Sequence, residues 1–383
     1  MAEMGLNAAR ISLSWPRIMP EGRGSVNRKG IDFYNRVIDE LLRRGLTPFV
    51  TLYHWDLPQT LEDGGGWPKR ELAEFFRDYA EVVARNFGDR VKHWIVFNEP
   101  WVFTILGYLT GIHAPGRREP MEALKATHVV SLAQGMAVRT IRENAKPEAV
   151  GTAFSMQPCY PKKDSPEDRA AAERFSQFLN FWFLEPVMNG RYPEIFMTGT
   201  SEALLEIKPG DLEVVRAPLD FIGINLYSRM FVAHDHTEPN LGARQAPASE
   251  GAEVTDFGWE VYPRALSEMI LSVTREYGRL PIYITENGCS YGEGPGPDGR
   301  VHDHRRTSFL KRYIGEVGRA LEQGADVRGY FQWTFTDNFE WAEGFSQRFG
   351  AVHCDFDSQK RTVKESGHWY SALARSNTLE TDK

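Results

Sequence analysis

The chain has 383 residues, of which 42% are hydrophobic, so it can bury the core of one large domain or of two ordinary ones. Its formal net charge is -7 and it has no run of Lys or Arg, which argues against a nucleic-acid partner. Three widely spaced cysteines cannot form a disulfide framework, and no apolar stretch reaches the roughly 18 residues of a membrane span. The first residues lack the basic start and apolar core of a signal peptide, so we expect a cytoplasmic protein with no membrane partner.

Seven short, β-rich apolar runs alternate with amphipathic helical stretches along the chain. The runs predict strands at residues 8–13, 47–52, 93–97, 150–154, 221–226, 282–285 and 329–333. Apolar residues recur at helical spacing over residues 31–42 and again over 72–83, which predicts a helix in each of the first two gaps. This alternation is typical of βα units arranged around a parallel sheet.

No change in composition marks a domain boundary, and the stretches rich in Gly and Pro follow the ends of predicted strands. We therefore predict a single α/β domain over residues 1–383, folded as a (β/α)8 TIM barrel rather than as two doubly wound sheets. Only seven strands are visible, and residues 2–5 resemble the last turn of a helix. We expect an incomplete barrel from which the first strand and most of the first helix are missing.

Polar residues gather at one end of the predicted strands, where a barrel of this type carries its functional groups. They are Arg10, His54, Asn98, Glu99, Asn225, Tyr227, Glu286, Trp333, Glu340 and Trp341. Taken singly, several have a purely structural explanation. Glu99 could be a helix cap or loop acid, and His54 could be a hydrogen-bonded core histidine. Glu286 could be an ion-pair partner of Arg10. Their repeated occurrence at matching strand ends favours a functional site.

Glu99 and Glu286 supply the two carboxyl groups that cleavage of a glycosidic bond requires. One carboxylic acid protonates the leaving oxygen, while the other carboxylate attacks or stabilises a centre that resembles an oxocarbenium ion. We expect Glu286 to stay ionised as the nucleophile, beside Arg10 and Tyr227. Glu99 would need a pKa raised by burial and by the charge of Glu286 in order to donate a proton. The tryptophans fit this chemistry, because indole faces stack on sugars.

Two His-Asp-His sequences, at residues 234–236 and 302–304, are the other candidates for chemistry. Both lie in polar loops and lack the i, i+4 spacing or a third ligand that a metal site needs. The Gly-rich stretch 292–296 is not followed by the Lys-bearing helix of a phosphate-binding loop. We therefore predict no metal and no cofactor.

A resemblance to a known family lies in the segments RISLSWPRI, YHWDLPQTLEDGGGW, FNEPW, ITENG and DNFEWAEGFSQRFG. In these segments the chain resembles glycoside hydrolase family 1, the β-glucosidase family, and the likeness runs from Gly5 to Leu373. The pairing of FNEP with ITENG is the most specific signal. The resemblance implies that Glu99 is the general acid/base and Glu286 the nucleophile of a retaining reaction.

The same resemblance implies supporting roles for the other polar residues. Those that would support the nucleophile are Arg10, Tyr227 and Asn225. Those that would bind the terminal sugar are His54, Asn98, Trp333, Glu340 and Trp341. Within this second group, Asn98 would contact the 2-hydroxyl, and Glu340 would take the hydroxyls at carbons 4 and 6.

Two departures from the family's pattern bear on activity. The family's first strand, with a Gln that binds the sugar, has no counterpart in the sequence, and FSMQP at residues 154–158 stands where relatives often carry Asn. The leading hypothesis is an exo-acting β-glycosidase for a small β-glucoside, or for a related β-galactoside or β-fucoside. The alternative is a truncated barrel that binds sugar with impaired or no catalysis. Neither hypothesis predicts an oligomeric state.

Overall fold

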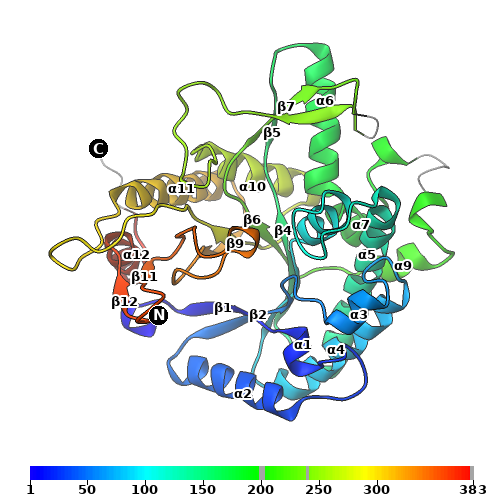
Figure 1. Ribbon diagram of the computed structural model, residues 1–383, viewed down its shortest axis with the longest axis horizontal. Helices are drawn as coiled ribbons and strands as arrows, with labels where there is room; N and C mark the ends of the chain where they lie inside the picture. The colour runs from blue at the N-terminus through cyan, green and yellow to red at the C-terminus, as the bar shows by residue number, and fades with distance from the viewer. Residues whose placement is uncertain (198–202, 239–240, 380–383) are drawn as a thin grey trace. The chain divides into compact units, whose positions relative to one another are not determined.

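The computed structural model describes residues 1–197, 203–238 and 241–379 (Figure 1). Its largest sheet has the strand order β1-β2-β3-β4-β6-β9-β10. These strands are β1 (Ala8–Ser12), β2 (Thr47–Tyr53), β3 (His93–Asn98), β4 (Ala149–Ser155), β6 (Phe221–Asn225), β9 (Ile282–Asn287) and β10 (Val327–Gln332). All seven predicted strands are confirmed, with small shifts at their ends. One shift corrects the prediction, because β9 continues to Asn287 and Glu286 therefore lies inside the strand.

The chain forms two compact units, each assembled from separate stretches of sequence. Unit 1 comprises Met1–Asn7, Met156–Ser176 and Ile224–Lys383. Unit 2 comprises Ala8–Ser155 and Gln177–Gly223. The assignment of residues 1–383 to a single domain stays a prediction.

Unit 2 contains the first four strands, which pair in parallel and in sequence order. Its helical segments are α1 (Trp15–Ile18), α2 (Arg28–Arg43), α3 (Gln59–Asp63), α4 (Glu71–Phe87), η2 (Val102–Leu109), α5 (Pro120–Asn144), η3 (Gln177–Phe181), α7 (Leu184–Asn189), η4 (Glu194–Phe196) and α9 (Asp211–Val215). The two predicted helices are α2 and α4. Each buries one apolar face, which includes Ile31 and Ile38 in α2 and Phe76 and Val83 in α4.

An aromatic cluster in unit 2 joins α1, β2, α4 and β3. Its members are Trp15, Tyr53, Trp67, Phe76, Tyr79 and Phe97, all buried. Phe76 stacks on Phe97 with ring centroids 4.6 Å apart, and the Tyr79 hydroxyl donates to the Leu52 carbonyl at 2.9 Å. Burial of one such ring contributes about 2–3 kcal/mol. The cluster therefore provides rigid support for the ends of β2 and β3, which carry His54, Asn98 and Glu99.

Unit 1 contains β9 and β10, which pair in parallel. Its helical segments are η1 (Ala2–Met4), α6 (Pro166–Ser176), α10 (Arg264–Tyr277), α11 (His304–Glu322), η5 (Trp341–Glu343) and α12 (Glu365–Ser376). Two small sheets were not predicted: β5-β7-β8 (Cys159–Pro161, Met230–His234 and Ala243–Ala246) and β11-β12 (Val352–Cys354 and Arg361–Val363). Four of these five strands have only three or four residues, which is too few to show a clear alternating pattern.

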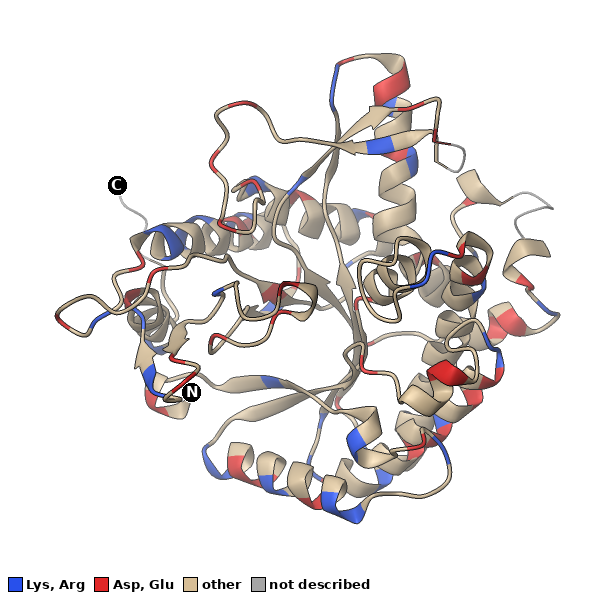
Figure 2. Ribbon diagram, viewed as in Figure 1, with Lys and Arg blue, Asp and Glu red and all other residues tan. Residues whose placement is uncertain are grey.

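The outer helices carry mixed charge. Lys and Arg are interspersed with Asp and Glu along α2, as Figure 2 shows, so this helix presents no surface of a single sign. Within the described part of the chain, we find no helix with the length and apolar character that crossing a bilayer requires.

Candidate active site

The predicted site residues fall into two groups, one in each unit. The group in unit 2 consists of Arg10, His54, Asn98 and Glu99. The group in unit 1 consists of Asn225, Tyr227, Glu286, Trp333, Glu340 and Trp341. Most lie at or just after the C-terminal ends of strands, as expected for a barrel of this type, and Arg10 lies in the middle of β1.

In unit 2, hydrogen bonds connect Arg10, Asn98 and His54. The Arg10 guanidinium donates to Thr51 Oγ1 at 3.3 Å and to Asn98 Oδ1 at 2.5 Å. Asn98 Nδ2 lies 3.0 Å from His54 Nε2, and His54 Nδ1 lies 2.9 Å from Ser12 Oγ. Three neighbouring strands are thus linked at the end where the predicted site lies.

The direction of these hydrogen bonds assigns the protons of His54. Arginine has only donors, so the Asn98 atom that faces Arg10 must be the oxygen, and the nitrogen must face His54. His54 Nε2 therefore accepts, which leaves the proton on Nδ1, where it donates to Ser12. Burial, followed by the charge of Arg10, holds the pKa of His54 well below its ordinary value. His54 is accordingly a neutral imidazole of fixed orientation.

Glu99 has an unusual backbone conformation directly after β3. Its φ of 48° lies in the left-handed region, which few residues other than glycine adopt. Its N–H donates to the Ala153 carbonyl on β4 at 2.8 Å, and the residue is only 7% exposed. Trp55 also has a positive φ, of 86°, and its indole N–H donates to the Asn98 carbonyl at 2.9 Å. Strain of this kind concentrates at functional sites, and it turns the chain sharply at Glu99.

In unit 1, Glu286 is buried and is held by a tyrosine. The Tyr227 hydroxyl donates to Glu286 Oε2 at 2.6 Å, and Glu286 is 4% exposed. The Tyr313 hydroxyl donates to the Tyr227 carbonyl at 2.9 Å, and the Tyr227 ring packs against Trp259 with centroids 4.9 Å apart. Tyr227 is therefore fixed on two sides, and a charge-assisted hydrogen bond of this length orients the carboxylate strongly.

Asn225 contacts the residue next to Glu286. Its Oδ1 accepts a hydrogen bond from Thr285 Oγ1 at 2.6 Å, and its backbone carbonyl accepts one from the Met156 N–H at 2.9 Å. Asn225 thus ties the end of β6 to the strand that carries Glu286.

The two residues that follow Glu286 have structural roles that explain why the ITENG motif ends in Asn-Gly. Asn287 is fully buried; its Nδ2 donates to the Leu226 carbonyl, and its Oδ1 accepts from the Tyr330 hydroxyl, both at 2.6 Å. A Cβ placed on Gly288 would lie 1.9 Å from the Trp333 carbonyl oxygen, so only glycine fits there. Sequence reasoning missed both roles, although the Asn-Gly pair that follows Glu286 was a usable signal.

Glu340 lies in the loop after β10, and its surroundings disfavour the ionised form of its carboxyl group. Burial, followed by the negative charge of Glu286, raises its pKa to about 7, against a smaller opposing effect of a hydrogen bond from Trp333. Among the described residues, its Oε2 is buried with no hydrogen-bond partner. Trp341 follows with a positive φ of 44°. Glu340 is therefore positioned to accept hydrogen bonds from a ligand.

Comparisons with known proteins identify the family. The sequence pattern of Glycosyl hydrolase family 1 matches residues 1–379. The chain belongs to glycosyl hydrolase family 1. This family 1 chain is 44% identical to Beta-glucosidase A of Thermotoga maritima, over 99% of the chain and 84% of that relative. It is 43% identical to the 1,4-beta-D-glucan glucohydrolase of Thermotoga neapolitana, over 98% of the chain and 84% of the relative.

Solved structures agree with this membership. The family 1 b-glucosidase from Thermotoga maritima superposes with a TM-score of 0.95 at 42% identity, covering 99% of this chain and 85% of that one. The same enzyme in complex with deoxynojirimycin superposes with a TM-score of 0.94 at 43% identity, with the same coverage. The predicted TIM-barrel fold is confirmed, and this family 1 chain is a glycoside hydrolase.

Proposed function

We propose that this glycoside hydrolase is a retaining exo-β-glucosidase, with Glu286 as the nucleophile and Glu99 as the general acid/base. The observation that carries the proposal is the buried Glu286 carboxylate, held at 2.6 Å by the Tyr227 hydroxyl. The names of the relatives, which include Beta-glucosidase A, support a β-glucoside as substrate. A β-galactoside or β-fucoside fits the same chemistry.

The reaction has two steps, and both carboxyl groups act in each of them. In the first step Glu99 gives its proton to the glycosidic oxygen while a Glu286 oxygen bonds to the anomeric carbon, which releases the alcohol and leaves a glycosyl ester. In the second step Glu99 takes a proton from water as the water attacks the anomeric carbon and Glu286 leaves. The hydrogen bond from Tyr227 fixes the orientation of the Glu286 carboxylate that attacks the anomeric carbon.

The remaining predicted residues would hold the sugar. Asn98 and His54 are held in fixed orientations by Arg10 and Ser12, so a ligand meets side chains that need no rearrangement. Trp333 and Trp341 offer apolar indole faces, and Glu340 offers a carboxylate. We infer that these groups form the pocket for the terminal non-reducing sugar.

The stereochemistry of the first product tests the proposal. With an aryl β-glucoside, proton NMR during the first minutes should show β-glucose before mutarotation produces the α anomer. Initial α-glucose would indicate inversion and would contradict the double displacement. A retaining reaction also requires the Glu99 and Glu286 carboxyl groups to lie about 5–5.5 Å apart. Binding of the sugar without any product would favour the alternative, a sugar-binding barrel with impaired catalysis.

Cytoplasmic location belongs to this proposal as well. It is supported by the three cysteines, which are free thiols, two of them buried. No nucleic-acid or membrane partner is proposed.

Glu340→Gln should make the protein more stable at alkaline pH and weaken substrate binding. An acid whose pKa is raised by folding does not lower the free energy of unfolding at a pH below its unfolded-state pKa. As the pH rises, the acid increasingly destabilises the folded state, and the full loss is reached above its folded-state pKa. For Glu340 this window runs from 4.5 to about 7. The full cost is at most about 3 kcal/mol before solvent screening reduces it. We expect the variant to melt above the parent at pH 8 and close to it at pH 5, with a raised KM.

The matched control for this prediction is Glu343→Gln, an exposed acid in the same loop. It should change the difference in Tm between pH 5 and pH 8 far less, because the charge of Glu343 is the smallest of the causes that raise the pKa of Glu340. If Glu340→Gln shifts Tm equally at both pH values, Glu340 does not titrate between pH 4.5 and about 7.

A further inference from the structure

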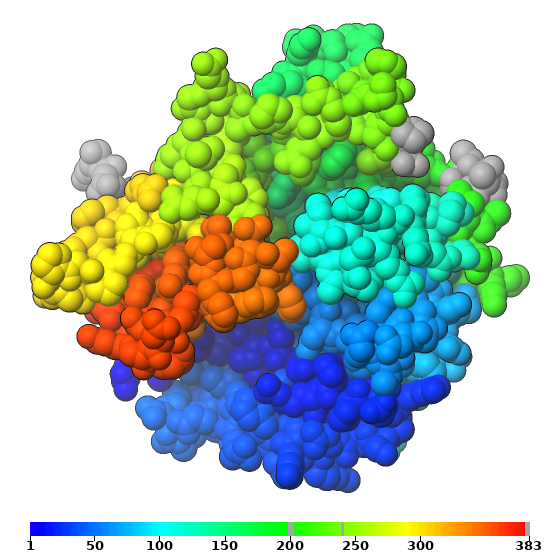
Figure 3. Space-filling view, in the orientation of Figure 1, coloured from blue at the N-terminus to red at the C-terminus, as the bar shows by residue number. Residues whose placement is uncertain are grey.

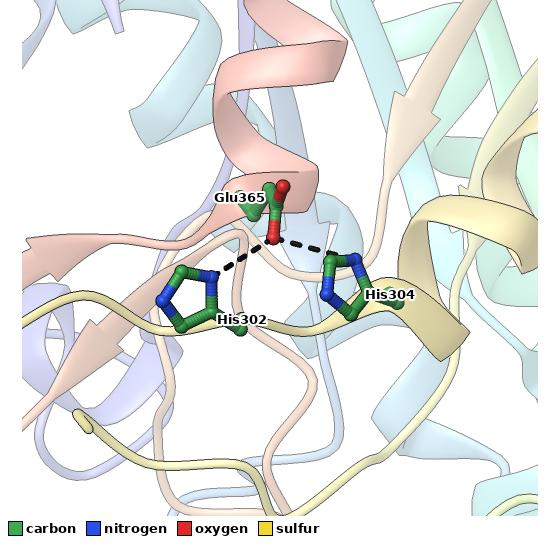
Figure 4. Close-up of side chains that lie close together, drawn as sticks. All are labelled: His302, His304 and Glu365. Carbon is green, nitrogen blue, oxygen red and sulfur yellow. Dashed lines mark hydrogen bonds and ion pairs between the residues drawn. The ribbon is translucent and has the colours of Figure 1, made fainter.

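The strongest feature outside the proposed active site is a cluster of two histidines and a glutamate in unit 1. His302 and His304 flank Asp303 at the start of α11, and Glu365 begins α12 (Figure 4). The sequence offered no third ligand beside this His-Asp-His motif. The fold supplies it from α12, which corrects the expectation that the motif lacks a partner.

The cluster has the dimensions of a metal site. Glu365 Oε2 lies 3.3 Å from His302 Nδ1 and 3.4 Å from His304 Nδ1, and all three atoms lie within 4.8 Å of one another. Ligands about 2.0–2.1 Å from a tetrahedral Zn²⁺ are separated by about 3.3–3.4 Å along each edge of the tetrahedron. Two edges therefore match, and the two histidine ligand atoms that define the third lie within 4.8 Å of each other.

A neighbouring carboxylate sets the tautomer that metal binding requires. Asp298 Oδ2 lies 2.9 Å from His302 Nε2, so that nitrogen carries the proton when the imidazole is neutral, and Nδ1 presents its lone pair towards Glu365. A carboxylate behind a histidine ligand is the usual outer partner at zinc sites.

The backbone that carries the ligands is held rigidly. Asp303 is fully buried; its carboxylate accepts hydrogen bonds from the Ser366 N–H at 2.8 Å and from the Ser366 hydroxyl at 2.5 Å. On the other side of Glu365, the buried Lys364 ammonium donates to Asp337 at 2.9 Å. Asp303 is thus fixed to Ser366, and Lys364 is fixed to Asp337, while the three ligands themselves face solvent.

The cluster of His302, His304 and Glu365 is accessible to ions from solution. Figure 3 shows the segment around residue 300 on the outside of the molecule, so a hydrated ion can reach it without a change of fold. The alternative explanation is a set of exposed ion pairs around a protonated His302, because Asp298, followed by Glu365, raises the pKa of His302. Exposed pairs of this kind contribute little to stability, and they predict no rise in Tm when Zn²⁺ is added.

We propose that His302, His304 and Glu365 bind a divalent transition metal of the zinc class, through two imidazole nitrogens and one carboxylate oxygen, with water completing the coordination. Imidazole with one carboxylate suits Zn²⁺ better than Mg²⁺ or Ca²⁺. The bound metal would link the start of α11 to the start of α12 and so stabilise the folded state. This site is independent of the proposed glycosidase chemistry.

The test is a thermal titration of the full chain, freed of metal with a chelator and then supplied with ZnCl₂. Saturating Zn²⁺ should raise Tm by about 3 °C or more. His304→Ala and Glu365→Gln should each abolish this shift. The Zn²⁺-induced shift is compared within each protein, because the substitutions also remove ion pairs. Co²⁺ should give a visible absorption band of tetrahedral type that disappears in the same two variants.

The matched control is His236→Ala, in the other His-Asp-His motif. His234 in that motif binds the Gly242 carbonyl through Nδ1, and among the described residues no third ligand joins it. This variant should keep the full Zn²⁺ shift. An equal shift in the wild type and all three variants, or no shift in the wild type, would overturn the proposal. Hydrolysis of a β-glucoside is assayed separately, so failure of one proposal does not bear on the other.

Discussion

Replacing Glu286 by Gly should lower the hydrolysis of an aryl β-glucoside by about 10⁴-fold or more, because no other group can form the bond to the anomeric carbon. Added azide should restore turnover of a substrate with a good leaving group, since the small anion fits where the carboxylate was removed. The expected product is α-glucosyl azide, formed by a single displacement from the side on which Glu286 attacks. Product analysis by NMR and the rate with and without azide measure both effects.

The control for this experiment is a thermal melt. Glu286→Gly removes a buried charge together with its hydrogen bond from Tyr227, so folding must be verified before activity is compared. A folded variant that azide does not rescue, or one that retains most of the parent activity, would remove Glu286 from the nucleophile's role.

Glu99→Ala should separate substrates by their leaving groups. Alkyl glucosides and cellobiose need a proton on the departing oxygen, so their kcat/KM should fall by about 10²–10⁴-fold. Dinitrophenyl glucoside needs little protonation, so its rate of bond cleavage should fall far less. The glycosyl ester should then accumulate, because no base activates water, and a burst of dinitrophenol should be followed by slow turnover.

The product formed with azide distinguishes Glu99→Ala from Glu286→Gly. With Glu99→Ala it should attack the glycosyl ester and give β-glucosyl azide, the opposite anomer from that expected with Glu286→Gly. Equal losses on alkyl and dinitrophenyl substrates would show that Glu99 is not the proton donor.

The sequence predicted the parts of the molecule that depend on local pattern. The strands and the two long helices follow from apolar periodicity, because a buried face repeats every two or 3.6 residues. The predicted site residues could be selected because polar groups such as Asn98 and Glu286 end or follow buried strands, where an uncompensated charge is costly. Their roles and the spacing of the two carboxyl groups stay predictions.

Features that depend on residues far apart in sequence could not be predicted. The tautomer of His54 follows from a chain of contacts that begins at Arg10. The raised pKa of Glu340 depends on burial and on Glu286, which lies on another strand. The third ligand of the histidine cluster, Glu365, belongs to a separate helix. None of these has a periodic signal, because each is set by the tertiary fold.

The contact between Gly288 and Trp333 has a mechanical consequence. The Trp333 carbonyl fills the space that a side chain at position 288 would occupy, and the Trp333 N–H donates to the Asn287 carbonyl at 2.9 Å. The backbones at the ends of β9 and β10 are thereby coupled, so that a displacement of the Trp333 backbone by a bulky ligand would also shift the strand that bears Glu286. Laboratory evolution towards larger sugars should therefore leave position 288 unchanged and alter side chains in the loop beyond Trp333.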